Sequence, residues 1–392
     1  MALEGISLLL LSGLMVAYIA LLHSRGLIAH RLTSRDRTVY TQKIKHRYPF
    51  FDTVKGLAII AVVIIHAPLL IEHFGSELPE HFLHSGEYIN RIMRFAIPFF
   101  FISSGALLEL PDLDVSSLKR FWLPKLKRIG IPYALFSLLA VTLTMEETGT
   151  VFQGIKRTGE ALLTGNALIP YWFIPVLFQL YLIYPLIWYL IVKRKTDIYK
   201  LLASSFAFSL ISYFLFSSYW HNWQSHIGDL TFMGSFLFLF VLGIALRPLF
   251  FSESRARVWL KSIDFPYFFL VLILAYIVLF PVNPLHGFYN VRLIYGPVLA
   301  LGLFYFYPYV AQIKPLEKGL SYLGRESLYI YLLHFGIMTV TAEIIFLSPL
   351  LSDLSPYLLF AVLFFSGLFL SQGLVVIVRN MVNSFLKTVI TN

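Results

Sequence analysis

The sequence contains no cysteine and few charged residues. Without cysteine, the chain has no thiol nucleophile, no disulfide and no thiolate metal site. Charged residues make up 13% of the 392 residues, about half the share that is typical of soluble domains. Walker loops, dinucleotide fingerprints and nucleophile elbows are also missing. A soluble enzyme, a disordered protein and a secreted disulfide scaffold are therefore excluded.

Long apolar runs are what the sequence has instead. Hydrophobic residues account for 58% of the chain, and a helix of about 20 such residues crosses the hydrocarbon core of a bilayer. No stretch alternates apolar and polar residues as a membrane barrel strand does. The sequence predicts an all-α, polytopic transmembrane bundle with eleven spans, at 4–23, 52–71, 93–110, 130–146, 171–192, 198–217, 230–249, 265–281, 292–312, 326–349 and 355–378.

Positive charge is concentrated in every second connection between these spans. Of the 31 Lys and Arg residues, 25 lie in segments 24–50, 111–128, 193–200, 247–262, 313–325 and 379–392. Connections rich in Lys and Arg stay in the cytoplasm. We therefore expect a multi-pass plasma-membrane protein with its N-terminus outside and its C-terminus in the cytoplasm. The net charge of +10 reflects this topology and does not indicate a nucleic-acid partner.

The first predicted span is separate from the others in sequence. Its basic residues follow the apolar run, whereas those of a signal peptide precede it. We expect residues 1–23 to form an N-terminal membrane anchor and 24–50 a basic cytoplasmic linker. Residues 51–378 then form the main membrane domain, and 379–392 a cytoplasmic tail. Segments 72–91 and 146–170 are expected to be outer connections.

The second predicted span carries ionisable residues on one face. Asp52 is a suitable N-cap at its inner boundary. His66 follows Lys55 by eleven residues, which places the two on one helix face about 16 Å apart along the axis. An ionisable group inside a membrane is functional by default, and imidazole suits proton transfer near neutral pH. The alternative is that Lys55 only snorkels to the inner interface while His66 packs near the outer one.

These residues resemble the hallmark of the acyltransferase 3 family of integral membrane O-acyltransferases. That hallmark is an Arg followed after ten residues by a His, in a helix that reads D-x-x-R-G-x-A. This sequence has Asp52, Lys55, Gly56, Ala58 and His66 at that spacing, with Lys in place of Arg. Members related to surface-polysaccharide acetylation have Lys there too. Further similar motifs follow in order at 97–105, 125–132, 171–173, 184–186 and 323–334.

The resemblance implies transfer of an acyl group, usually acetyl from acetyl-CoA, to an acceptor beyond the membrane. Acyl-CoA would be a cosubstrate, and we expect no permanently bound cofactor and no metal ion. We expect the acceptor to be a hydroxyl of an extracytoplasmic glycan or lipid-linked sugar, with membrane lipid as the other partner. His66 is the expected general base, and a transient acyl-histidine is an open alternative. Lys55, Lys125 and Arg128 are expected to bind the phosphates of acyl-CoA.

Five more polar or small residues are candidates for the site, each with a structural alternative. Arg94 would steady an oxyanion or bind the acceptor, or else snorkel outward. His334, near mid-membrane, would be catalytic, or else a buried histidine paired with a tyrosine. Ser104 and Gly105 would line an acyl channel, or else allow close helix packing. Trp172 would contact the channel or acceptor, or else belong to the aromatic belt.

Two other functions are compatible with the sequence. A polysaccharide or lipid-linked glycan exporter would also place polar groups near the midplane, without acyl-transfer chemistry. A catalytically inactive relative would keep the helices and act as a sensor. Replacing His66 by Ala separates these classes, because the change removes acyl transfer in an enzyme and leaves transport intact in an exporter.

Overall fold

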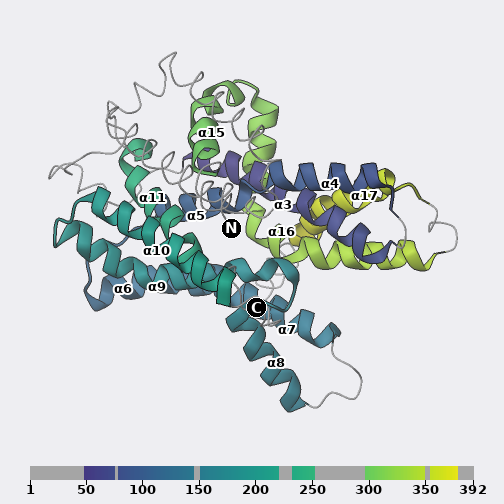
Figure 1. Ribbon diagram of the computed structural model, residues 1–392, viewed down its shortest axis with the longest axis horizontal. Coiled ribbons are helices and arrows are strands. Elements are labelled where there is room, and N and C mark those ends of the chain that lie inside the picture. The colour runs from purple at the N-terminus through teal and green to yellow at the C-terminus, as the bar shows by residue number, and fades with distance from the viewer. Residues whose placement is uncertain are drawn as a thin grey trace, which may run out of the picture. The chain divides into compact units, whose positions relative to one another are not determined.

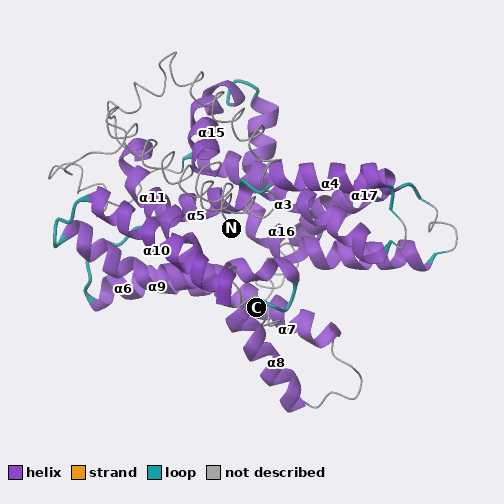
Figure 2. Cartoon of the chain, viewed as in Figure 1, coloured by secondary structure: helices purple, strands orange, loops and turns teal. Residues whose placement is uncertain are grey.

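Helices make up the part of the chain that the structure describes. The structure is a computed structural model, and it describes residues 48–75, 78–144, 151–219, 232–251, 296–348 and 354–377. Within these ranges every regular element is a helix and none is a strand (Figure 2). The predicted all-α class is confirmed.

Most of the predicted spans correspond to helices (Figure 1). In chain order the α-helices are α3 (Pro49–Phe74), α4 (Glu80–Met93), α5 (Ala96–Leu107), α6 (Val115–Lys125), α7 (Ile131–Thr144), α8 (Val151–Thr164), α9 (Phe173–Val192), α10 (Ile198–Tyr219), α11 (Gly234–Phe251), α15 (Gly296–Val310), α16 (Lys314–Leu347) and α17 (Pro356–Phe365). A π-helix, η1 (Leu126–Gly130), joins α6 to α7, a 3-10 helix, η2 (Ile169–Trp172), precedes α9, and a second π-helix, η5 (Ser366–Leu370), follows α17.

Five helical stretches in the described ranges are long and apolar enough to cross a bilayer. They are Pro49–Phe74, Val115–Thr144, Ile169–Val192, Lys314–Leu347 and Pro356–Ile377. Shorter apolar helices match three other predicted spans, at Ala96–Leu107, Ile198–Ser212 and Gly234–Pro248. The spans predicted at 4–23 and 265–281, nearly all of the linker at 24–50 and the tail at 379–392 lie outside the described residues.

Several segments expected to be connections contain helices: 111–128 includes the whole of α6, and 313–325 includes the first turns of α16. Segment 72–91 includes most of α4, and segment 146–170 includes the whole of α8. The reason is amphipathicity, which charged residues between the apolar positions obscure in the sequence. In α8, Phe152, Ile155 and Leu163 are exposed, whereas Ala161 is buried. Figure 1 shows α7 and α8 side by side as a helical hairpin, so this connection turns back along the preceding helix.

Helix starts also differ from the sequence-based expectation. Helix α3 begins at Pro49, so Asp52 lies inside its first turn and is not the N-cap. A carboxylate there still interacts favourably with the helix dipole. The N-cap of α6 is Asp114, whose carboxylate accepts hydrogen bonds from the Ser116 and Ser117 amides. Hydrogen bonds from Ser116 and Ser117 lower the pKa of Asp114 to about 2, so the cap stays ionised near neutral pH.

The helices form two compact units, described separately below. Among the described residues, the first unit contains 48–50, 97–127, 173–219, 232–251 and 296–316. The second unit contains 51–75, 78–96, 128–144, 151–172, 317–348 and 354–377.

Glycines allow close backbone contact within each unit. In the second unit, a Cβ on Gly56 would overlap the Leu320 carbonyl, and one on Gly324 would overlap the Asp52 carbonyl. Helices α3 and α16 therefore meet backbone to backbone, as small residues permit between membrane helices. In the first unit, Gly105 of α5 lies in the same way against the Phe240 carbonyl of α11.

Candidate functional site

One uninterrupted helix, α3, carries both ionisable residues of the predicted second span. Lys55 and His66 are half-buried side chains of this helix. Eleven residues at about 1.5 Å each separate them by about 16 Å along the axis. The residues between them carry no charge. The structure therefore has the axial spacing and the apolar stretch on which the sequence argument depended.

The imidazoles of His66 and His334 contact each other in the second unit. Nδ1 of His66 lies 3.2 Å from Nε2 of His334, and the ring centroids are 5.1 Å apart. His334 comes from α16 and is completely buried. The ring of Phe335 meets the ring of His66 at 82° with centroids 5.5 Å apart, which encloses the pair on another side. Two histidines that were proposed separately from the sequence thus belong to one cluster.

Backbone carbonyls determine which ring nitrogens carry protons. Nδ1 of His66 lies 2.7 Å from the Val62 carbonyl oxygen. Nδ1 of His334 lies 2.8 Å from the Tyr331 carbonyl oxygen and 3.1 Å from that of Ile330. A carbonyl only accepts hydrogen bonds, so in each neutral ring the proton is on Nδ1. In each neutral ring, the hydrogen bond at Nδ1 therefore leaves Nε2 without a proton.

This assignment determines which nitrogen donates and which accepts in the hydrogen bond between His66 and His334. Nε2 of His334 is an acceptor, and Nδ1–H of His66 is shared between it and the Val62 carbonyl. Nε2 of His66 then carries a lone pair, and within the described ranges no hydrogen bond reaches it. A nitrogen in this state can take a proton from a hydroxyl group, while His334 stabilises the positive charge that develops on the His66 ring.

Helix α17 and the π-helix η5 pack beside the histidine-bearing helices. Gly367 of η5 lies against Met338 of α16 and Val63 of α3. A Cβ at Gly367 would come within 2.6 Å of the Met338 sulfur. The glycine thus permits α17 and η5 to approach α3 and α16 one turn away from the pair. π-Helical turns are frequent at functional sites.

Three other predicted site residues also lie in the second unit. Arg94 is the half-buried C-cap residue of α4, and its Nε donates a hydrogen bond to Oδ1 of Asn90 at 2.6 Å. Arg128 is exposed in the π-helix η1. Trp172 is the half-buried last residue of η2. Their predicted roles toward oxyanion, acyl-CoA and acceptor stay predictions.

The remaining predicted residues belong to the first unit. Nζ of Lys125 donates to the Phe121 carbonyl at 3.0 Å and lies 3.4 Å from the centroid of the Phe121 ring. Ser104 interacts with the hydroxyl of Tyr181, whose ring also lies 5.2 Å from Lys125 Nζ. Gly105 lies at the α5–α11 crossing, which is the packing alternative raised for it. Their roles in acyl-CoA binding and in a channel likewise stay predictions.

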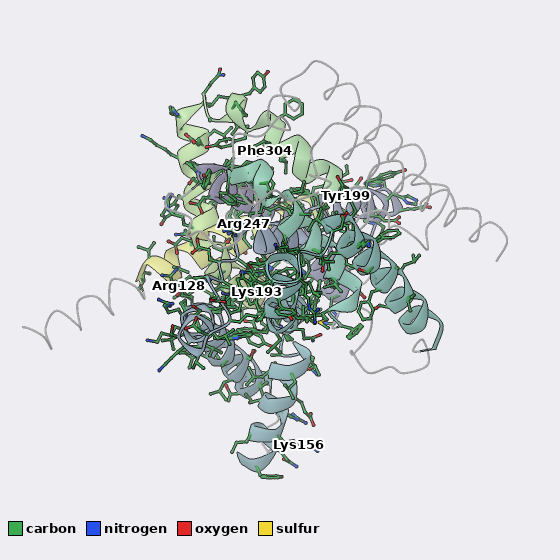
Figure 3. The ribbon with its side chains drawn as sticks, turned by 90° about the vertical axis from the view of Figure 1, so that its left-hand side faces the viewer. Arg128, Lys156, Lys193, Tyr199, Arg247 and Phe304 are labelled. Carbon is green, nitrogen blue, oxygen red and sulfur yellow. The ribbon has the colours of Figure 1, made fainter. Side chains whose placement is uncertain are left out.

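Sequence reasoning missed the buried Arg247 of the first unit. Its side chain is 2% exposed, and Nη1 donates to the carbonyls of Ala106, at 3.0 Å, and of Leu108. Figure 3 shows Arg247 among packed side chains. A cation bound to the last carbonyls of α5 stabilises the negative end of that helix. Arg247 lies both in the basic segment 247–262 and inside the predicted span 230–249, and a cation inside a predicted span is the signal that could have found it.

Comparisons with known proteins agree with the motifs. Neither the curated proteins nor the solved structures gave a match to this chain. A family model described as an acyltransferase domain matches residues 48–376, which is most of the chain. With its apolar spanning helices, the chain is a membrane protein that belongs to the acyltransferase 3 family.

Proposed function

We propose that the protein transfers an acyl group, which we expect to be acetyl, from acyl-CoA to a hydroxyl of a glycan or lipid-linked sugar on the outer side of the membrane. The family supplies the reaction class, acyl transfer. The observation that carries the proposal further is the histidine pair, in which Nδ1 of His66 is held by Val62 and His334 while Nε2 stays available as a base.

The proposed reaction proceeds by direct attack of the acceptor. Nε2 of His66 takes the proton of the acceptor hydroxyl as its oxygen attacks the carbonyl carbon of the thioester. The C–O bond forms, the C–S bond breaks, and the proton on His66 passes to the leaving sulfur of CoA. The products are an O-acyl ester and free CoA. His334 accepts the Nδ1–H hydrogen bond throughout and stabilises the transient imidazolium.

Cations of the second unit would bind the phosphates of acyl-CoA and stabilise the oxyanion of the transition state. Lys55 and Arg128 would bind phosphates of acyl-CoA, Lys55 as a point charge and Arg128 as a fork. Arg94, whose Nε is held by Asn90, would stabilise the oxyanion through the positive charge of its guanidinium.

The test uses membranes that contain the full chain. Acetyl-CoA labelled in its acetyl group is added, and label is counted in the glycan and lipid-linked sugar fractions, with release by mild alkali identifying an ester. We expect the wild-type protein to transfer label and His66→Ala to lose at least about a hundredfold in rate. The control is His73→Ala, which removes an exposed histidine from the last turn of the same helix.

The outcomes separate the proposal from its rival. Absence of labelled ester with the wild-type protein, combined with glycan export that depends on this chain, would favour the exporter. Normal transfer by His66→Ala would retain the enzyme and refute the role of His66.

A further inference from the structure

Helix α16 and the 3-10 helix η2 exchange two tyrosine hydrogen bonds. The hydroxyl of Tyr171 in η2 donates to the Leu332 carbonyl of α16 at 2.5 Å. In the opposite direction, the hydroxyl of Tyr331 in α16 donates to the Pro170 carbonyl of η2. The two bonds are reciprocal, because each element supplies one hydroxyl and one carbonyl from adjacent residues. Such a pair resists both sliding and rotation of α16 against η2.

This exchange involves the turn of α16 that carries His334. Tyr331 has two roles, since its hydroxyl bonds to η2 while its carbonyl accepts from Nδ1 of His334 at 2.8 Å. Leu332, which accepts from Tyr171, is two residues before His334. Any rotation of this turn would therefore move Nε2 of His334 relative to His66.

Tyr171 is itself fixed from its other side. It is 1% exposed, and its ring meets that of Tyr133 at 67° with centroids 5.9 Å apart. The hydroxyl of Tyr133 donates to the Ala161 carbonyl of α8 at 2.9 Å. Between α8 and η2, Gly165 has a φ of 76°, and a Cβ there would overlap the backbone of Trp172. The tight turn at this glycine brings η2 back against the helix that carries Tyr133.

We propose that Tyr331 and Tyr171 are positioning residues, which hold the His334 turn so that its Nε2 accepts from Nδ1 of His66. The inference rests on the proposed function of His66 as a base. The nitrogens are 3.2 Å apart, at the upper end of the range for hydrogen bonds. A small displacement of α16 would therefore break the bond, and misplacements of about 1 Å in active sites cost up to about a hundredfold in rate.

The kinetic test removes single hydroxyl groups from the full chain in lipid nanodiscs, with labelled acetyl-CoA as donor and the glycan fraction as acceptor. We expect Tyr331→Phe and Tyr171→Phe each to lower kcat about tenfold while the KM for acetyl-CoA stays within about twofold. Tyr329→Phe is the matched control: Tyr329 lies on the same helix, and no hydrogen bond of its hydroxyl is found in the described ranges. We expect this variant to keep the wild-type kcat.

A spectroscopic test reports on the histidines without turnover. The chain has 11 histidines, and ¹⁵N labelling of them with comparison to His334→Phe identifies the His334 signals. We expect the wild-type spectrum to show His334 protonated at Nδ1 only. In Tyr331→Phe, the two nitrogens of His334 should move toward an average of both tautomers, and in Tyr329→Phe they should not.

The combined results test the positioning role of the tyrosines separately from the role of His66 as a base. Wild-type kcat and unchanged His334 signals in both Tyr331→Phe and Tyr171→Phe would overturn the positioning role, while loss of transfer in His66→Ala would still support the proposed function. If His66→Ala transfers normally, the proposed function of His66 fails, and the His334 spectra still test whether the tyrosines hold the turn. Should one tyrosine variant fail to fold, the other decides.

Discussion

His334 is a completely buried histidine with both ring nitrogens engaged. Such a residue could have a purely structural role as a buried histidine paired with a tyrosine, which is the alternative stated for it above. The arrangement of its hydrogen bonds indicates a more specific role, as the hydrogen-bond acceptor for His66. Because Nδ1–H of His334 is directed at backbone carbonyls, only Nε2 is left to accept, and it faces His66. The burial that would suit a structural residue here also keeps solvent from His334 itself.

Replacing His334 by Phe tests this part at the level of one residue. Phe fills the space of the imidazole but cannot accept the Nδ1–H hydrogen bond of His66. The Val62 carbonyl still accepts that bond at 2.7 Å and keeps the His66 tautomer. We therefore expect His334→Phe to lower kcat about tenfold or more, but less than His66→Ala does. Equal losses in the two variants, measured on folded protein, would mean that His334 is itself a proton carrier.

At the scale of elements, the crossing of α3 and α16 sets the distance between the two histidines. Gly56 and Gly324 let the backbones meet near the start of the shared path of these helices. The His66 and His334 side chains lie farther along the same pair. The close contact at the crossing therefore holds α3 and α16 in the arrangement that brings His66 and His334 together.

Gly324→Ala should destabilise the protein, because its Cβ would overlap the Asp52 carbonyl and the helices must separate. Overpacking of this kind typically costs about 1–3 kcal/mol, which thermal unfolding in detergent would detect as a lower Tm. Gly319→Ala is the control, since a Cβ there meets nothing within 4 Å on the same helix. Equal Tm values for the two variants would show that the crossing tolerates a methyl group.

The elements also show how far sequence reasoning reaches. Apolar runs predicted the spanning helices α3 and α9 within a few residues, because burial in hydrocarbon depends mainly on composition. Helix α16 begins at Lys314, twelve residues before the predicted span, because its first turns are charged and not apolar. Amphipathic helices α4 and α8 were missed, since their charges resemble those of a solvated loop. The role of Gly105 in helix packing depends on which backbone lies opposite, Phe240 in this case, and a sequence does not give that.

At the scale of the whole molecule, the charge pattern predicts an orientation that the cysteine-free sequence makes easy to test. We introduce one cysteine at a time and treat intact cells with a maleimide that does not cross membranes. Ser85→Cys, in the exposed part of α4, should react from outside. Lys318→Cys, exposed near the start of α16, should react only after the cells are opened. The reverse pattern would contradict the predicted orientation.

The site was partly predictable for a physical reason. The spacing of Lys55 and His66 follows from helix geometry alone, so the sequence sufficed to place both on α3. The contact of His66 with His334 joins residues 268 positions apart, and the tyrosine bonds join residues 161 apart. Long-range contacts of this kind depend on how helices pack, which composition and periodicity do not specify.

The most direct measurement of the central claim is chemical rescue of His66→Gly by free imidazole. If His66 is the base, the variant should be nearly inactive in transfer from labelled acetyl-CoA. Added imidazole should then restore transfer in proportion to its concentration, and it should leave the wild-type protein and His73→Ala unaffected. Transfer by His66→Gly at the wild-type rate without imidazole would contradict the account.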